Sequence, residues 1–372
     1  ADEEMSSTRV LPKDVLLNIT GASIGRCTLA PYDIGPANVN QHVCIIRTNP
    51  SRLIPEFLNL VLQSRDIQQS ITASENGSSR EGLNFEQVGE FEIPLPSIER
   101  QAEIIRVAGS KVDSLEQLLT HKYKLLETLA EKRRALITHA VTQGLDPKAP
   151  MRDSGIPWLG KIPAHWEIMQ LRRLVISLEQ GWSPVAANNP AGENELGVLK
   201  LSAIKQGKFI SSENKSLLPG DTIPVGLEIR KGDVFITRAN TPKLVGDVAV
   251  AEKDHSNLTF SDLIYRVRPN CARATAHFIE SALLSDASRF QIEAEAKGSS
   301  GSMVKLAQDQ VLSLQLPVPP IIEQNRILEH QRAGLEAIDK LSDSAERTLT
   351  LLQERRTTLI SAAVTGQLEV AG

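Results

Sequence analysis

The sequence is poor in the residues on which several classes of protein depend. It has three cysteines, Cys27, Cys44 and Cys271, among 372 residues, and no two of them have the CxxC spacing. A disulfide framework is therefore excluded, a zinc site is disfavoured, and a reducing, cytoplasmic location is expected. No apolar run approaches the roughly 18 residues that suggest a membrane span. The acidic start, ADEEMSSTRV, lacks the features of a secretory signal.

Aromatic residues and net charge are also scarce. Aromatic side chains make up 4% of the chain, and 41 basic residues face 45 acidic ones, for a net charge of −4. A mildly acidic chain is not expected to bind nucleic acid by bulk electrostatic attraction. The rest is an ordinary globular composition, 41% hydrophobic and 23% charged. At roughly 150 residues per domain, the length suggests two or three domains.

Motifs that carry catalysis are missing as well. Val318–Ile321 (VPPI) lacks the polar and aromatic residues with which adenine methyltransferases hold a base. Gly155–Ile162 lacks the Ser or Thr of a phosphate-binding loop. The seven histidines form no HExxH pattern, and no Ser/His/Asp set can be assembled from the spacing. We therefore expect a chain that is not an enzyme and that holds no cofactor or metal ion of its own.

The chain contains an internal repeat. Glu131–Leu145 (EKRRALITHAVTQGL) and Glu354–Leu368 (ERRTTLISAAVTGQL) match at eight of 15 positions with an offset of 223. The same offset pairs Phe91–Pro96 (FEIPLP) with Leu314–Pro319 (LQLPVP), and farther upstream the offset becomes 221. The sequence thus holds two copies of one unit of about 220 residues.

The first copy lacks a counterpart of the start of the second, so it is either naturally shortened, cut or incompletely represented in these residues. Two full copies would need about 446 residues, twice the offset of 223, against the 372 present. Nothing in the first copy corresponds to Trp158–Asp221, a segment that includes Leu199–Phe209 (LKLSAIKQGKF).

Each copy begins with a mixed part of short strands and helices. Alternation of apolar and polar residues predicts strands at Val15–Ile19, Val43–Arg47, Leu263–Arg268 and Leu312–Leu316. Short helices are expected at Phe57–Leu62 and Phe278–Leu284. The fold class is therefore α+β, with two similar mixed domains.

Each copy then ends in a long helix. In the first copy it is expected from about Glu99 to Val141, with an apolar 3-4 seam that runs along it. Arg133 and Arg356 interrupt the two seams at equivalent places. About 40 residues make a rod of roughly 60 Å, and two rods with matching seams are expected to pack on each other. The connector 146–166, with four prolines, is expected to hold neither helix nor core strand.

Polar loops are the remaining candidates for function. Residues 198–243 hold eight Lys/Arg and four acids, and Thr237–Lys243 (TRANTPK) follows a predicted strand at Val234–Ile236. Arginine can reach guanine O6/N7 and asparagine can reach adenine N6/N7, so this loop could read base edges. The alternative is a solvated loop that contacts nothing, and composition alone favours that alternative. Glycine- and serine-rich loops in both copies suit phosphate contacts, or are ordinary turns.

The sequence motifs of this chain resemble those of a known family, the DNA specificity (S) subunits of type I restriction–modification systems. Residues 93–104 (IPLPSIERQAEI) and 317–327 (PVPPIIEQNRI) are similar to the family's IPLPPLxEQxxI signature. The connector Asp153–Glu167 (DSGIPWLGKIPAHWE) looks like the phrase that opens many of its recognition domains. The duplicated helix ends complete the resemblance, which covers essentially the whole chain.

The resemblance implies an organisation and a set of partners. Two target recognition domains, 1–97 (incomplete) and 167–320, would each read half of a bipartite double-stranded DNA site. The helices 98–145 and 321–372 would form an antiparallel coiled coil, with 146–166 as a linker. Two modification subunits would bring S-adenosylmethionine, and restriction subunits would bring ATP and Mg-dependent chemistry. No membrane is involved. The alternative is a coiled-coil adaptor that bridges proteins without reading DNA.

The resemblance implies that DNA is contacted by polar loops of the two recognition domains, and the candidate residues are taken from those loops alone. In the second copy they are Lys200, Ser202, Lys205, Arg238, Asn240, Thr241, Lys243, Ser299 and Ser300. In the first copy they are Thr20, Ser23, Arg26, Ser78, Ser79 and Arg80.

Overall fold

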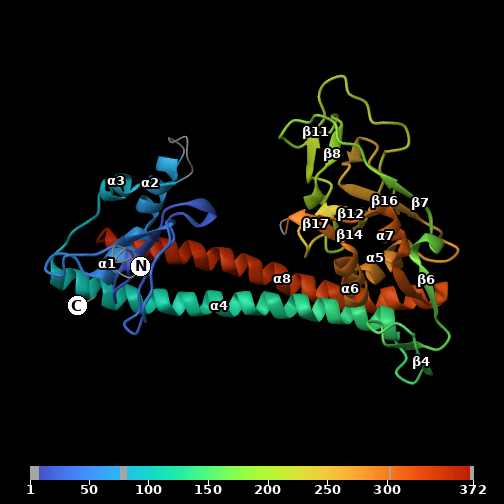
Figure 1. The fold of residues 1–372 in the computed structure, drawn as a ribbon, viewed down its shortest axis with the longest axis horizontal. Helices are drawn as coiled ribbons and strands as arrows, with labels where there is room; N and C mark the ends of the chain where they lie inside the picture. Colours follow the sequence, from blue (N-terminus) through green and yellow to red (C-terminus); the bar gives the residue numbers. More distant parts are fainter. Residues whose placement is uncertain (1–7, 76–81, 301–302, 369–372) are drawn as a thin grey trace. The chain divides into compact units, whose positions relative to one another are not determined.

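The structure is a computed structural model that describes residues 8–75, 82–300 and 303–368. Its contacts divide the chain into two compact units (Figure 1). Unit 1 comprises residues 1–127 and 342–372, and unit 2 comprises residues 128–341. The two long helices, α4 (Ile98–Gln143) and α8 (Ile321–Val364), each contribute one part to each unit.

Unit 1 has a small antiparallel sheet covered by helices. Its strands are β1 (Val15–Asn18), β2 (Cys27–Leu29) and β3 (Val43–Ile46), in the order β2-β1-β3, with the 3-10 turn η2 (Gly21–Ser23) after β1. Its short helices are α1 (Pro55–Leu62), α2 (Arg65–Glu75) and α3 (Phe85–Gly89). Val15 and Leu17 are fully buried whereas Leu16 is half-buried. Since successive side chains point to opposite faces, this sheet has one well-covered face.

Unit 2 is larger and follows the same plan with more strands. Before its central sheet come β4 (Met151–Asp153), β5 (Lys161–Pro163), β6 (Glu167–Gln170) and η3 (Leu171–Arg173). Then follow β7 (Val175–Gln180), β8 (Gly197–Leu199), η4 (Leu201–Ala203), β9 (Ile204–Lys205), β10 (Lys208–Phe209), β11 (Asn214–Ser216), β12 (Val234–Thr237), β13 (Ala239–Asn240), β14 (Val248–Val250), β15 (Leu258–Phe260) and β16 (Ile264–Pro269). The last elements before α8 are α5 (Ala276–Leu284), α6 (Asp286–Glu295), β17 (Lys297–Ser300), β18 (Met303–Lys305), α7 (Gln308–Ser313) and β19 (Gln315–Val318).

The central sheet of unit 2 has the order β14-β12-β16-β7. Its strands β14, β12 and β16 are buried on both faces, whereas the edge strand β7 is partly exposed. Val234 and Ile236 of β12 face the core that α5 and α6 cover, while Phe235 faces a second core. In that second core the ring of Phe235 lies 5.2 Å from that of Phe260 and 5.5 Å from that of Phe209. The three rings Phe209, Phe235 and Phe260 thus form the centre of this second core, which is the additional layer of unit 2.

The expected pairing of the two long helices is confirmed. In unit 1, Arg356 Nη2 lies 2.9 Å from Glu116 Oε1, and Gln353 Nε2 donates to the Tyr123 hydroxyl, so the helices run antiparallel. In unit 2, Arg133 Nη1 lies 2.6 Å from Asp339 Oδ1. Residues 116 and 339, like 133 and 356, are separated by the repeat offset of 223. The two arginines that interrupt the seams therefore form equivalent interhelical ion pairs, one in each unit.

A buried glutamine joins each mixed part to its long helix. Gln101 accepts from Ile54 N at 2.8 Å and donates to Arg52 O and Pro96 O, both at 2.8 Å. Gln324 makes the three equivalent bonds, with Thr275 N, Arg273 O and Pro319 O, at 2.9–3.0 Å. Neither residue is exposed to solvent. A fully satisfied buried amide of this kind fixes a single packing of the helix on the loop.

Most expected elements are present, and two expectations are wrong. Residues 308–313 form α7 instead of the start of a strand, because Gln310 accepts from Ala307 N and closes a helical turn that buries Val311. The strand begins at Gln315, where it pairs with β6.

The connector does hold a strand pair. β4 and β5 form a hairpin in which Arg152 is opposite Ile162. Ile162 is fully buried, and Trp166 is buried with its indole N–H donating to Glu323 Oε1 at 3.1 Å. The prolines lie outside or at the end of these short strands, and each strand of a two-stranded sheet has a free edge, so the missing N–H groups cost little.

Candidate nucleic-acid interface

Arg238 follows the central strand β12 and is held on a rigid support. Its guanidinium lies 5.9 Å from the ring centroid of Tyr265, and its Nη1 is 3.4 Å from Asp262 O. The Tyr265 hydroxyl donates to Leu306 O at 3.0 Å, and Leu306 N donates to Arg238 O at 2.9 Å. Burial raises the pKa of Tyr265, so its hydroxyl keeps its proton as a donor. Arg238 Nε is buried and has no hydrogen-bond partner among the described residues, so this N–H is closed to a ligand at the surface. The side chain as a whole is half-buried and is held in place by these contacts.

Asn240, Thr241 and Lys243 continue the same loop. Asn240 lies in β13 opposite Val304 of β18, and its side chain accepts from Thr241 N at 2.8 Å. Thr241 and Lys243 are exposed. Sequence reasoning missed the residue that positions this loop, Arg289 of α6, whose Nη1 donates to Val245 O at 2.5 Å. Its Nη2 lies 3.3 Å from two further carbonyls of the loop. No local pattern marks Arg289, because its partners lie more than 40 residues away in the sequence.

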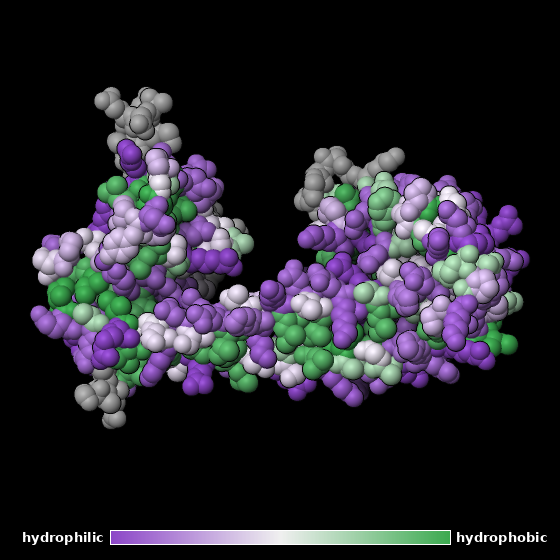
Figure 2. Space-filling view, turned by 90° about the horizontal axis from the view of Figure 1, so that it is seen from below, coloured by the Kyte–Doolittle hydropathy of each residue, from purple (hydrophilic) through white to green (hydrophobic). Residues whose placement is uncertain are grey.

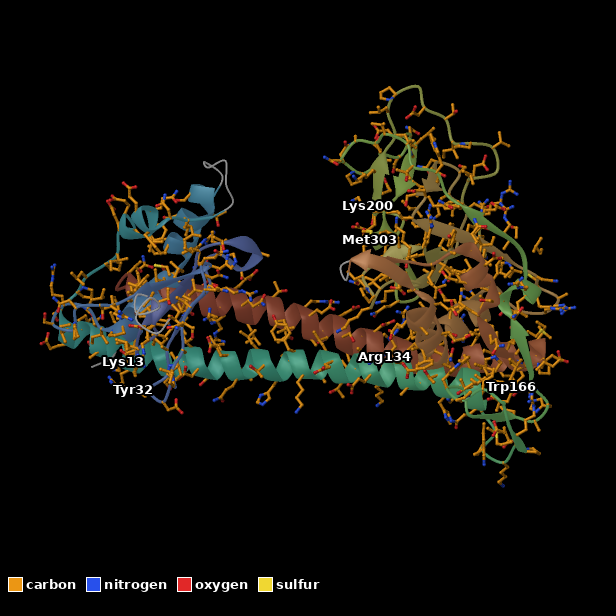
Figure 3. The ribbon with its side chains drawn as sticks, viewed as in Figure 1. Lys13, Tyr32, Arg134, Trp166, Lys200 and Met303 are labelled. Carbon is orange, nitrogen blue, oxygen red and sulfur yellow. The ribbon has the colours of Figure 1, made fainter. Side chains whose placement is uncertain are left out.

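A three-stranded sheet, β13-β18-β17, brings two of the predicted segments together. It places the backbone of Arg238–Asn240 beside β18, which pairs in turn with β17. Ser299 and Ser300 lie in β17, but their side chains are outside the described part of the structure. Lys305 of β18 lies opposite both Ala239 and Lys297, and is a basic residue that sequence reasoning did not select. Figure 3 draws Met303, also of β18, on the same side of unit 2 as Lys200.

Lys200, Ser202 and Lys205 surround the short turn η4. Glu213 partners two of them: its Oε2 lies 2.6 Å from Ser202 Oγ and 3.7 Å from Lys200 Nζ. The Ser202 hydrogen bond and the Lys200 charge lower the pKa of Glu213, which keeps the carboxylate ionised. Lys205 is exposed and forms no ion pair within the described residues. Of this group, Lys205 is thus the cation most available to a phosphate.

Unit 2 also holds a buried arginine that sequence reasoning missed. Arg266 of β16 is 0% exposed and contacts the carboxylates of Glu179 and Asp233 and two carbonyls of the loop before β12. Burial raises the pKa of Glu179, but the hydrogen bond and charge of Arg266 outweigh it, so the net shift is downward. This network ties β7 and β16 to the loop that leads into β12, the strand that Arg238 follows.

The candidate residues of the first copy are less organised. Thr20 Oγ1 lies 2.5 Å from His42 Nδ1, and Ser23 Oγ accepts from Asn18 Nδ2 at 2.5 Å, so both hydroxyls are already engaged. Arg26 is exposed beside an open cavity. Ser78, Ser79 and Arg80 lie outside the described residues. Unit 1 thus offers one available cation of the original set.

Two further features concern metals and membranes. Over residues 8–75, 82–300 and 303–368, no group of three or more His, Cys, Asp or Glu side chains is arranged to hold a metal ion. Within the same ranges, no helix is both long and apolar enough to cross a membrane.

The sequence is similar to those of known proteins. Residues 3–128 match the family model described as "Type I restriction modification DNA specificity domain". The specificity subunit of the type I restriction enzyme EcoEI from Escherichia coli is 25% identical over 241 residues, 64% of this chain and 39% of that subunit. The chain therefore spans well under half of this relative.

Two other proteins are similar over nearly the whole chain. The putative MjaX specificity subunit of Methanocaldococcus jannaschii is 21% identical over 375 residues, 99% of this chain and 81% of that protein. A solved structure from work on complex assembly and conformational transition of the type I R-M system is 18% identical. It covers 97% of this chain and 83% of its own, with a TM-score of 0.61. At this identity the likeness shows the fold alone.

Proposed function

We propose that this chain, which is similar to the type I restriction–modification specificity subunits, reads DNA sequence for such an enzyme. The observation that supports this most directly is Arg238, whose half-buried side chain is held over Tyr265 on the loop that follows β12. An arginine held in one position suits recognition of guanine in the major groove. Asn240 and Lys243 on the same loop would add an adenine contact and a phosphate contact.

On this proposal the chain is not an enzyme and has no cofactor of its own. Modification subunits would supply S-adenosylmethionine, restriction subunits would supply ATP and Mg-dependent chemistry, and the assembly would act in the cytoplasm. Leu118 on α4 and Leu341 on α8 are 48% and 56% exposed, and they are equivalent at the offset of 223. Figure 2 shows hydrophobic patches along these helices on the face seen there. The equivalent exposed apolar residues on the two repeats would each suit the binding of one modification subunit.

The two units would differ in their ability to recognise DNA sequence. Unit 2 would read one half of a bipartite site. Unit 1 would read the other half only after it gains a counterpart of Trp158–Asp221, which these 372 residues do not contain. The chain on its own is thus expected to prefer a single half-site.

The test removes one base-reading side chain. In the chain assembled with its modification subunits, Arg238→Ala should weaken binding to the preferred duplex by about 1–3 kcal/mol and relax preference at one position. Arg230→Ala is the matched control, because it removes the same charge from an exposed residue that precedes β12 instead of following it. Gel shifts against preferred and scrambled duplexes distinguish the two. Equal weakening by both variants, or binding without sequence preference, would favour the adaptor function and contradict the proposal.

A further inference from the structure

Two aromatic side chains of unit 2 meet at its surface. Trp158 of the connector and Phe290 of α6 have ring centroids 6.3 Å apart, with 31° between the ring planes. Trp158 is partly buried and Phe290 is 57% exposed. Aromatic side chains contribute strongly to binding energy at interfaces. A pair that remains open to solvent is therefore a candidate binding site.

A small pocket lies beside this pair. It has a volume of about 250 Å³ and is lined by both rings, by the last turn of α6 and by residues 313–315. Pockets that hold whole drug-sized molecules measure roughly 300–1,000 Å³. The pocket therefore suits a single side chain or head group.

The lining of the pocket favours a positive charge. The Glu295 side chain lines it and forms no ion pair within the described residues, and Gln310 Nε2 donates to Glu295 Oε2 at 3.2 Å. No Lys, Arg or His of the described residues lines the pocket. Since α6 ends at Glu295, the partial negative charge of a helix C-terminus lies beside the carboxylate.

The walls of the pocket are held by hydrogen bonds. Gln291 Nε2 donates to Gln315 O at 2.9 Å, and Gln315 N donates to Gln291 Oε1 at 2.8 Å. The Ser313 hydroxyl donates to Gln310 O at 2.9 Å. These bonds join α6 to the segment that leads into β19, so the pocket is formed before a ligand arrives.

We infer that this pocket binds the guanidinium of an arginine side chain that a partner polypeptide presents. A guanidinium is planar, so it can stack on an aromatic ring while its N–H groups donate to a carboxylate. Because the two centroids are 6.3 Å apart, one cation can lie within about 6 Å of both. An ammonium group is more strongly hydrated and has no plane to stack. The small volume favours the end of a side chain over a whole metabolite.

The repeat gives this site to unit 2 alone. At the offset of 221, Gln69 and Ser74 stand where unit 2 has Phe290 and Glu295, and Trp158 has no counterpart in the first copy. A partner that uses the pocket is therefore expected to bind one repeat and not the other. The inference does not depend on DNA reading.

Fluorine NMR of the 372-residue chain labelled with 5-fluorotryptophan tests the inference, because the three tryptophans give separate signals. The Trp158 signal is assigned by its loss in Trp158→Phe, and the signals of Trp166 and Trp182 are internal controls. The peptide acetyl-Gly-Arg-Gly-amide should shift the Trp158 signal alone. Its Kd should be at least about threefold lower than that of the lysine peptide, since arginine adds stacking. The citrulline peptide keeps the planar shape without the charge and should cause no shift.

Three variants sharpen the test. Phe290→Leu and Glu295→Gln should each weaken binding of the arginine peptide about two- to fivefold. Glu293→Gln is the matched control, because this acid lies on the same helix but pairs with Arg289, and the Kd should not change. Absence of a Trp158 shift, equal binding of the arginine peptide and either other peptide, or a Kd that both site variants leave unchanged would overturn the inference. Tighter binding of free L-arginine than of the peptide would indicate a metabolite site and would also overturn it.

Discussion

Units 1 and 2 are built from one repeat, yet the same sequence pattern forms a strand in only one of them. Gln315–Val318 pairs with β6, whereas its counterpart Glu92–Leu95 forms no strand and finds no partner among the described residues. Likewise β16 is paired on both sides, and its counterpart β3 is paired with β1 alone. Strand formation here depends on a neighbour for the backbone groups more than on local propensity. The segment Trp158–Asp221 supplies those neighbours in unit 2.

The largest expected effect separates the two units. Arg266→Ala should lower the stability of unit 2 by about 3–5 kcal/mol, because it removes the fully buried partner of Asp233 and Glu179 and leaves them only the more exposed Arg268. The counterpart in unit 1 is the half-buried Ile45, and Ile45→Ala should cost only about 1–2 kcal/mol. All three tryptophans, Trp158, Trp166 and Trp182, lie in unit 2, so tryptophan fluorescence in urea reports unit 2 by itself.

Hydrogen exchange in peptides from α1 reports unit 1 in the same samples. If Arg266→Ala and Ile45→Ala lowered the free energy of unfolding of their own units by similar amounts, the stability of the second core of unit 2 would not depend on Arg266.

The second prediction concerns what the units share. Gln101→Leu and Gln324→Leu should each destabilise their own unit by about 2–4 kcal/mol, since each leaves buried backbone groups unpaired. The two losses should agree within about 1 kcal/mol because the three hydrogen bonds are equivalent. Urea unfolding followed by fluorescence and hydrogen exchange measures both. A loss in only one unit would contradict the equivalence of the two helix attachments.

The third prediction is a pH dependence of unit 2. The pKa of Glu179 is lowered in the folded state, so its contribution to stability is present above the ordinary glutamate value of 4.5 and is lost as pH falls below it. The urea midpoint read by tryptophan fluorescence should therefore fall between pH 5 and about pH 3. In Glu179→Gln this fall should be smaller. An unchanged slope in the variant would show that other carboxylates cause the acid sensitivity.

The smallest expected effect lies in the rod. Arg133→Met and Arg356→Met each remove one interhelical ion pair whose carboxylate is partly exposed, and each should cost about 0.5–1 kcal/mol. Since the pairs are equivalent at the repeat offset, raising the salt concentration should shrink both costs together. Thermal unfolding at low and high salt measures this. A cost several times larger for one variant would indicate that its arginine has a role beyond the pair.

The sequence predicted most of the fold because the repeat and the periodicities are local signals. The alternation at Val15–Ile19 and the seam from Val112 to Ala140 needed only neighbouring residues, and both elements are present. Phe91–Pro96 carries the same pattern as a true strand, but its missing partner could not be deduced from the pattern itself. A strand needs a second segment to pair with. In unit 2 that segment is β6, which is not part of the repeated motif, so the motif alone could not show that unit 1 lacks it.

The candidate site was less predictable for the same reason. Arg238 was selected from residue type, and the structure adds what holds it and the loop that follows: Tyr265 and Asp262 contact Arg238, and Arg289 holds the carbonyls of residues 242–245. These supports lie 24 or more residues away along the chain, so spacing gave no sign of them. Ser202 and Lys200 were selected in the same way, but both are engaged by Glu213, 11 and 13 residues farther along.

The central claim is that, within these residues, the second copy alone carries a complete sequence-reading surface. Selection of randomised duplex DNA by the 372-residue chain bound to its modification subunits tests it most directly. The account predicts enrichment of one contiguous half-site, lost in Arg238→Ala and kept in Arg230→Ala. Enrichment of two half-sites at a fixed spacing, or of a half-site that survives Arg238→Ala unchanged, would contradict it.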